Sequence, residues 1–143
     1  MKQNLSVLVI DDDPATTDLL SLLLMPVTSE VIIANSGGEG IDLAHEYEPD
    51  FILLDLMMPD MTGAEVSAEI RKFSSVPILI LSAINHPQLV ASALDNGADN
   101  FLRKPVSEEI LVSQIRRMTS RAPVADKAIP PAPFSEWFTS KSP

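Results

Sequence analysis

Three consecutive carboxylates, Asp11, Asp12 and Asp13, directly follow the strand-like run Leu5–Ile10. Carboxylates that are packed together repel one another, so a folded chain keeps them close only where a positive charge lies among them. A divalent cation supplies that charge, and oxygen ligands in a chain without cysteine favour Mg²⁺ over Zn²⁺. The acidic run is therefore a candidate Mg²⁺ site, in which Mn²⁺ could substitute.

Three further polar side chains stand at the ends of later apolar runs: Asp55 after "FILL", Ser82 after "PILIL" and Lys104 after "NFLR". A bound cation leaves one carboxylate free to act as a nucleophile toward phosphorus, and a metal together with an ammonium neutralises the transferred group. Lys104 could then bind one phosphoryl oxygen, and Ser82 could donate a hydrogen bond to another. The combination predicts a site that forms an aspartyl phosphate.

Five short apolar runs provide the strands that would position these residues. Segments with helical spacing separate the runs, and this alternation predicts βαβ units in a parallel sheet. The runs "FILL" and "PILIL" show no polar alternation, as expected for strands buried on both faces. The predicted fold is a doubly wound α/β sandwich, (βα)5, in three layers, which binds ligands beyond the carboxyl ends of its strands. The predicted strands are Leu5–Ile10, Glu30–Ala34, Phe51–Leu54, Pro77–Leu81 and Asn100–Leu102.

The intervening segments carry signals for helix starts. Asp13 precedes Pro14, which predicts an N-cap followed by the first helical residue. Thr62 and Glu65 have the spacing of a capping box. Further starts are expected at Ser36, Pro87 and Ser107, and a stop at Asn96-Gly97. The apolar face of the first helix is expected to contain Leu19, Leu20, Leu23 and Leu24.

The composition limits the classes of function. Acidic residues number 20 against 10 basic ones, so the net charge is −10. This balance argues against nucleic-acid binding by the chain and is compatible with a basic protein partner. No apolar run approaches the ~18 residues of a membrane span, and the N-terminus lacks the features of a signal peptide. We expect a cytoplasmic protein that does not bind membranes.

The last part of the chain, residues 122–143, differs in composition from the rest. It holds five of the 12 prolines and the single tryptophan. Such a segment is typical of an extended linker or of a docking tail, and Phe134, Trp137 and Phe138 are its candidates for a contact. We therefore expect one domain over residues 1–121, followed by this tail.

Four segments resemble the motifs of one family, the receiver domain of two-component response regulators. They are "VLVIDDDP", "FILLDLMMPDMTG", "PILILSA" and "GADNFLRKP", and the resemblance covers about Leu5 to Ser120. It implies a flavodoxin-like fold in which Asp55 accepts a phosphoryl group from a sensor histidine kinase or a phosphotransfer protein. Phosphorylation would then change the surface of the domain and so act on an output domain or a partner protein.

The resemblance also implies a role for each site residue. Asp12 and Asp55 would bind Mg²⁺ directly and Asp11 mainly through water, with the backbone carbonyl of Met57 as a further ligand. Ser82 and Phe101 would form the switch, and Lys104 would contact the phosphoryl group. The Lys104–Pro105 peptide bond is expected to be cis. Such a protein is not an enzyme in the usual sense, because it catalyses only its own phosphorylation and dephosphorylation.

Two departures from the family pattern lead to hypotheses. Phe101 replaces the more frequent tyrosine and should favour the inward rotamer, which would bias the switch toward its active-like state. Met57 and Ile84 occupy the two positions that tune hydrolysis of the acyl phosphate, and neither side chain can hydrogen-bond an attacking water. We therefore expect a long-lived phosphoryl group on Asp55.

Two other interpretations stay open. Asp11 and Asp13 have the Asp-x-Asp spacing of Mg²⁺-dependent phosphohydrolases with a carboxylate nucleophile, although 143 residues leave no room for their usual cap domain. A degenerate receiver that only binds proteins is the other alternative. The presence together of Asp11, Asp12, Asp55, Ser82 and Lys104 argues against it.

Overall fold

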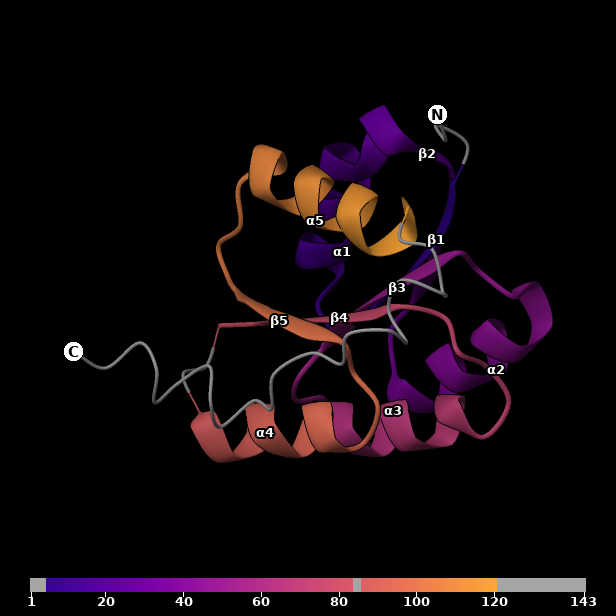
Figure 1. The fold of residues 1–143 in the computed structure, drawn as a ribbon, viewed down its shortest axis with the longest axis vertical. Helices are drawn as coiled ribbons and strands as arrows, with labels where there is room; N and C mark the ends of the chain where they lie inside the picture. Colours follow the sequence, from indigo (N-terminus) through magenta and orange to yellow (C-terminus); the bar gives the residue numbers. More distant parts are fainter. Residues whose placement is uncertain (1–4, 84–85, 121–143) are drawn as a thin grey trace.

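Five parallel strands form one sheet in the computed structural model, which describes residues 5–83 and 86–120 (Figure 1). The strand order is β2-β1-β3-β4-β5, so β5 is an edge strand that pairs with β4 alone. This order confirms the predicted doubly wound arrangement. The elements are β1 (Leu5–Ile10), α1 (Pro14–Leu24), the 3-10 turn η1 (Met25–Val27), β2 (Thr28–Ala34), α2 (Gly37–Tyr47), β3 (Phe51–Asp55), α3 (Gly63–Arg71), β4 (Ile78–Ser82), α4 (Pro87–Asp95), β5 (Asn100–Arg103) and α5 (Glu108–Ser120).

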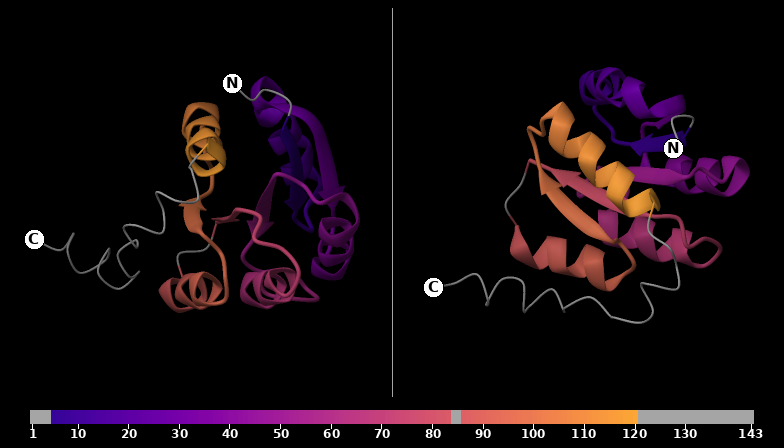
Figure 2. Two further views of the ribbon diagram at one scale, coloured as in Figure 1. Left: turned by 45° about the vertical axis from the view of Figure 1, so that its right-hand side comes forward. Right: turned by 45° about the horizontal axis from the view of Figure 1, so that its top comes forward.

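The helices cover both faces of the sheet. Helices α1 and α5 contact each other on one face, while α2, α3 and α4 lie in a row on the other (Figure 1, Figure 2). Alternate residues of β3 enter the two cores, Phe51 and Leu53 on the α1–α5 side and Ile52 and Leu54 on the opposite side. All four side chains are fully buried, which explains why this strand shows no polar alternation.

The local start signals are confirmed. Asp13 caps α1 by accepting a hydrogen bond from the backbone N–H of Ala15 at 3.1 Å. Thr62 and Glu65 form the complete capping box of α3. The remaining expected boundaries also hold: the structure has an N-cap at Ser36, a helix start at Pro87, a cap at Ser107 and a helix end at Asn96-Gly97.

One part of the predicted apolar face of α1 is wrong. Leu19 is 55% exposed, whereas Leu20 and Leu24 are buried and Thr17 joins them at the sheet. Helical spacing explains the difference, because residues 17, 20 and 24 fall on one side of the helix and residue 19 points away from it. A run of leucines therefore does not reveal by itself which of them face the core.

Several expectations lie outside the described residues. These are the tail at 122–143, with Phe134, Trp137 and Phe138, and the position of Ile84. Among the helices that the structure describes, none combines the length and apolar character needed to cross a bilayer.

Candidate functional site

The candidate site lies at the edge of the sheet where the strands end. Asp11 directly follows β1, Asp55 and Ser82 are the last residues of β3 and β4, and Lys104 directly follows β5. Because all five strands are parallel, their carboxyl ends meet along this edge. The order of the strands changes direction around β1 and β3, which is where open α/β sheets form their ligand crevice.

Three carboxylates gather at the crevice. Oxygen atoms of Asp11, Asp12 and Asp55 all lie within 4.8 Å of one another. Asp11 is buried, Asp55 is half-buried and Asp12 is exposed, so the cluster opens to solvent on one side. Asp13 takes no part, because its carboxylate caps α1 and also accepts a hydrogen bond from the Thr16 hydroxyl at 2.9 Å.

Lys104 reaches into the cluster from the edge of the sheet. Its Nζ donates a hydrogen bond to Asp11 Oδ2 at 2.8 Å and lies 3.7 Å from Asp55 Oδ1. The backbone N–H of Lys104 donates to the Ser82 carbonyl at 2.9 Å, which joins the ends of β4 and β5. The Lys104–Pro105 peptide bond is cis, as expected.

The balance of charge at the site is negative. The pKa of the Asp55 carboxyl is raised to about 6, mainly by burial and also by the negative charges of Asp11 and Asp12. The charge of Lys104 and the backbone N–H of Leu56 at 2.9 Å lower that pKa but do not cancel the effect. A carboxyl group in this position favours an additional cation, and the donor set of carboxylate oxygens fits Mg²⁺ or Mn²⁺.

The other predicted site residues lie on β4, on β5 and in the loop after β3. Ser82 is buried at the end of β4. Met57 lies two residues after Asp55 in the loop to α3, where its side chain is 44% exposed. Phe101 in β5 is half-buried and packs against the core on the α2–α4 side.

Two residues at this edge escaped the sequence analysis. The side-chain amide of Asn35 donates a hydrogen bond to the backbone carbonyl of Asp11 at 3.0 Å. The carboxylate of Asp60 accepts hydrogen bonds from the N–H groups of Gly37 and Gly38, at 3.1 and 3.0 Å. These contacts join residues more than 20 positions apart, so no local spacing signal could have found them.

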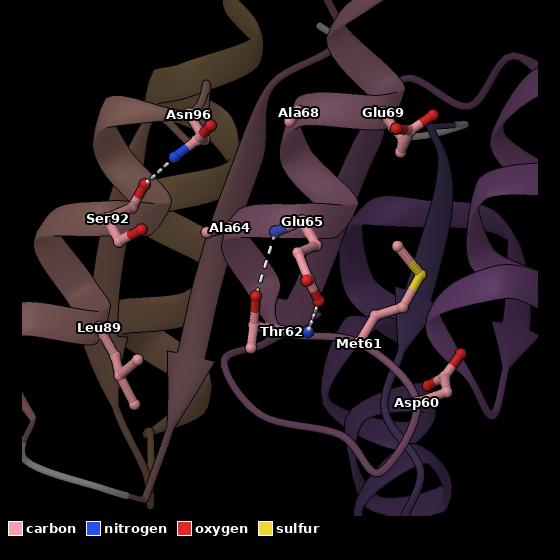
Figure 3. Close-up of a pocket in the computed structure, with 10 residues that line it drawn as sticks. All are labelled: Asp60, Met61, Thr62, Ala64, Glu65, Ala68, Glu69, Leu89, Ser92 and Asn96. Atoms are coloured by element: carbon pink, nitrogen blue, oxygen red, sulfur yellow. Dashed lines mark hydrogen bonds between the residues drawn. The ribbon is translucent and has the colours of Figure 1, made fainter.

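A separate hollow of about 650 Å³ lies between α3 and α4 (Figure 3). Its walls include Ala64 and Ala68 of α3 and Leu89 and Ser92 of α4. The capping box of α3 already uses the side chains of Thr62 and Glu65, and the Asn96 amide donates a hydrogen bond to the Ser92 carbonyl (Figure 3). This hollow is not where the acidic residues converge.

Comparisons with known proteins agree on one family. The profile of the response regulator receiver domain matches residues 7–116. A curated relative, the DNA-binding dual master transcriptional regulator RpaA of Synechocystis sp., is 38% identical over 127 residues, which cover 85% of this chain and 53% of the relative. The transcriptional regulatory protein AfsQ1 of Streptomyces coelicolor is 39% identical over 116 residues, 81% of this chain and 52% of the relative. The chain thus spans about half the length of the curated relatives it matches.

Solved structures show the same likeness. A two-component response regulator from Clostridium difficile superposes with a TM-score of 0.78 at 27% identity, over 82% of this chain and 98% of that one. A CheY-like receiver domain protein from Methanospirillum hungatei gives a TM-score of 0.75 at 27% identity, over 80% and 92% of the two chains.

Proposed function

The chain belongs to the response regulator receiver domain family, and we propose that it accepts a phosphoryl group on Asp55 and passes this event on through a change in its surface. One observation carries the proposal. Oxygen atoms of the Asp55 carboxylate and of two further carboxylates lie within 4.8 Å of one another, and a lysine ammonium lies 3.7 Å from Asp55. The residues named for the site are thus proposed in these roles: Asp55 as acceptor, Lys104 and Ser82 as its partners.

The proposed reaction is a phosphoryl transfer to a carboxylate. An oxygen of Asp55 forms a bond to phosphorus while the bond between phosphorus and the donor breaks, which leaves an acyl phosphate on Asp55. The donor would be the phosphohistidine of a sensor kinase or of a phosphotransfer protein. Water later cleaves the acyl phosphate and restores the carboxylate. Lys104, whose ammonium already lies beside Asp55, is positioned to pair with a phosphoryl oxygen.

A divalent cation belongs to the proposal. Asp11, Asp12 and Asp55 would hold Mg²⁺ together with the backbone carbonyl of Met57, and Mn²⁺ could replace it. When bound, Mg²⁺ supplies positive charge that offsets the negative charge of the transferred group. The raised pKa of Asp55 supports this step, because burial together with the charges of Asp11 and Asp12 outweighs the charge of Lys104.

The proposed output is a change of surface near β5. Ser82 would hydrogen-bond the phosphoryl group, and Phe101 would follow it inward, since both lie on neighbouring strands. The receiving partner would be an output domain or a separate protein. Two of the curated relatives are described as DNA-binding or transcriptional regulators, and we propose that this chain works as the receiver portion of such a regulator without contacting nucleic acid itself.

The structure bears on the phosphohydrolase alternative. That mechanism needs the carboxylates of Asp11 and Asp13 side by side, whereas the Asp13 carboxylate is engaged at the start of α1. A receiver that only binds proteins remains the competing hypothesis, and it predicts no phosphorylation of Asp55.

Intact-mass measurement tests the proposal. We expect one added phosphoryl group after incubation with acetyl phosphate and Mg²⁺, and none for Asp55→Asn or in the presence of EDTA. Asp42→Asn, which removes an exposed carboxylate of α2, is the matched control and should be phosphorylated like the wild type. If neither acetyl phosphate nor a histidine kinase produced the adduct, the binding-only hypothesis would replace this one.

A further inference from the structure

The loop between β3 and α3, residues 56–62, is closed by its own backbone. The N–H of Met58 donates to the carbonyl of Met61 at 3.1 Å, and Met57 pairs with Thr62 as an isolated antiparallel bridge. Met57 is the residue whose carbonyl is proposed as a metal ligand. Because the internal shape of the loop is set by these bonds, the location of Met57 depends on how the loop as a whole is attached to its surroundings.

Asp60, near the tip of this loop, attaches it to the start of α2. Its two carboxylate oxygens accept hydrogen bonds from the N–H groups of Gly37 and Gly38, at 3.1 and 3.0 Å. Figure 3 shows Asp60 and Met61 on the side of α3 that faces away from α4. Glycine permits this close approach, because a Cβ at residue 37 would lie 2.9 Å from Met61 Cβ.

Helix α2 already has a cap of its own. The Ser36 hydroxyl accepts a hydrogen bond from the N–H of Glu39 at 3.1 Å, and the Glu39 carboxylate accepts one from the N–H of Asn35 at 2.9 Å. The first N–H groups of a helix have no partner within the helix and carry partial positive charge. Asp60 accepts from the two N–H groups of the first turn that the local cap does not use. Its contact therefore joins the loop to α2 and is not needed to cap the helix.

The same helix start also holds the other acidic loop. The Asn35 amide donates to the carbonyl of Asp11 at 3.0 Å, and Asp11 and Asp12 are the metal ligands proposed at the end of β1. Asn35 on one side, and Gly37 and Gly38 on the other, therefore contact the two loops that would supply ligands to the metal.

We propose that Asp60 and Asn35 are positioning residues, which join the loop of Met57 to the loop of Asp11 through the start of α2 and so set the spacing of the metal ligands. This inference rests on the proposed function, because the cation whose ligands they position is the one proposed there. Neither residue touches the reacting atoms.

Metal affinity tests the inference directly. Free Mn²⁺ can be counted by electron paramagnetic resonance while the full chain is titrated, without any phosphorylation step. We expect Asp60→Ala and Asn35→Ala to weaken Mn²⁺ binding about tenfold, as is usual when a residue that orients a ligand is lost. Asp60→Asn keeps one acceptor oxygen and should fall between Asp60→Ala and the wild type. The control Ser36→Ala removes the cap of α2 but leaves the bridge, and its affinity should stay within about twofold of the wild type.

Amide hydrogen exchange in metal-free buffer provides a second measurement. In Asp60→Ala the amides of Gly37 and Gly38 should exchange faster, while circular dichroism should show an unchanged helix content. A wild-type protein that binds no Mn²⁺ would overturn the proposed function and this inference with it. Normal binding by the wild type, with Asp60→Ala equally tight or with Ser36→Ala equally weakened, would overturn the positioning role alone.

Discussion

Replacing Asp55 by asparagine should make the metal-free protein more stable at neutral pH, although it removes the proposed phosphoacceptor. Burial and the neighbouring negative charges raise the pKa of Asp55 from 3.8 to about 6. An acid whose pKa is higher in the folded chain is ionised more easily in the unfolded chain. The free energy of unfolding of the wild type therefore falls as the pH rises from about 4 to about 6, and the whole of this loss of stability is present above that range. Asparagine cannot ionise and avoids this cost.

The size of the effect follows from the same shift. Without screening by solvent, a pKa change from 3.8 to about 6 would lower the free energy of unfolding at neutral pH by about 3 kcal/mol. The site is open to solvent on the side of Asp12, and solvent screening reduces the expected gain of the variant to about 1–2 kcal/mol. The difference in free energy between variant and wild type should thus be close to zero at pH 4 and should reach this value above about pH 6.

Urea unfolding followed by far-ultraviolet circular dichroism, in EDTA and over a series of pH values, measures this difference. Asp42→Asn changes an exposed carboxylate of α2 and should give a difference that does not vary with pH in the same way. A variant Asp55→Asn that is less stable than the wild type at neutral pH, or a difference that does not depend on pH, would refute the reasoning. Adding Mg²⁺ at about 100 times its dissociation constant should stabilise the wild type by about 2.7 kcal/mol and reverse the order of the two proteins.

Three further outcomes are expected. Met57→Asn should shorten the lifetime of the acyl phosphate, because its amide can hydrogen-bond an attacking water; a time course of intact mass that showed equal or slower decay would contradict the long-lifetime hypothesis. Thr62→Ala should lower the free energy of unfolding by about 1 kcal/mol through loss of the α3 capping box, as measured by urea unfolding. Arg71→Met removes hydrogen bonds to Gly97 O at 3.0 Å and Asp99 Oδ2 at 2.9 Å. It should lower the free energy of unfolding by about 1–3 kcal/mol and speed amide exchange in the turn between α4 and β5. Unchanged exchange there would contradict the idea that Arg71 holds this turn in place.

Much of the fold could be predicted because the relevant signals are local. The run "FILL" has no polar position, and β3 is indeed buried on both faces. Asp13 and Thr62 act as caps within their own first turns, where spacing alone decides the hydrogen bond. The gathering of the acidic residues with Lys104 could also be predicted, because a parallel sheet brings the ends of its strands to one edge regardless of packing detail.

The remaining features depend on how elements pack together. The exposure of Leu19 follows from the rotation of α1 on the sheet, which a run of leucines does not specify. The bonds of Asp60 to Gly37 and Gly38 depend on the distance between a loop and a helix that are separated by β3. The chemical roles of Asp55, Ser82 and Lys104 stay predictions, because a static arrangement of groups does not record a reaction.

The position of β5 at the edge of the sheet has a consequence for local unfolding. Asp11 follows β1 and Asp55 ends β3, and both strands are paired on both sides, whereas Lys104 follows a strand of four residues that is paired on one side only. Strands held on one side open more readily than those held on both. A brief opening of β5 would withdraw the ammonium and leave the carboxylates facing one another. Once water hydrates these carboxylates, their mutual repulsion would oppose the open state only weakly. The candidate site therefore spans two regions that we expect to open independently, an acidic part after central strands and a basic part after an edge strand.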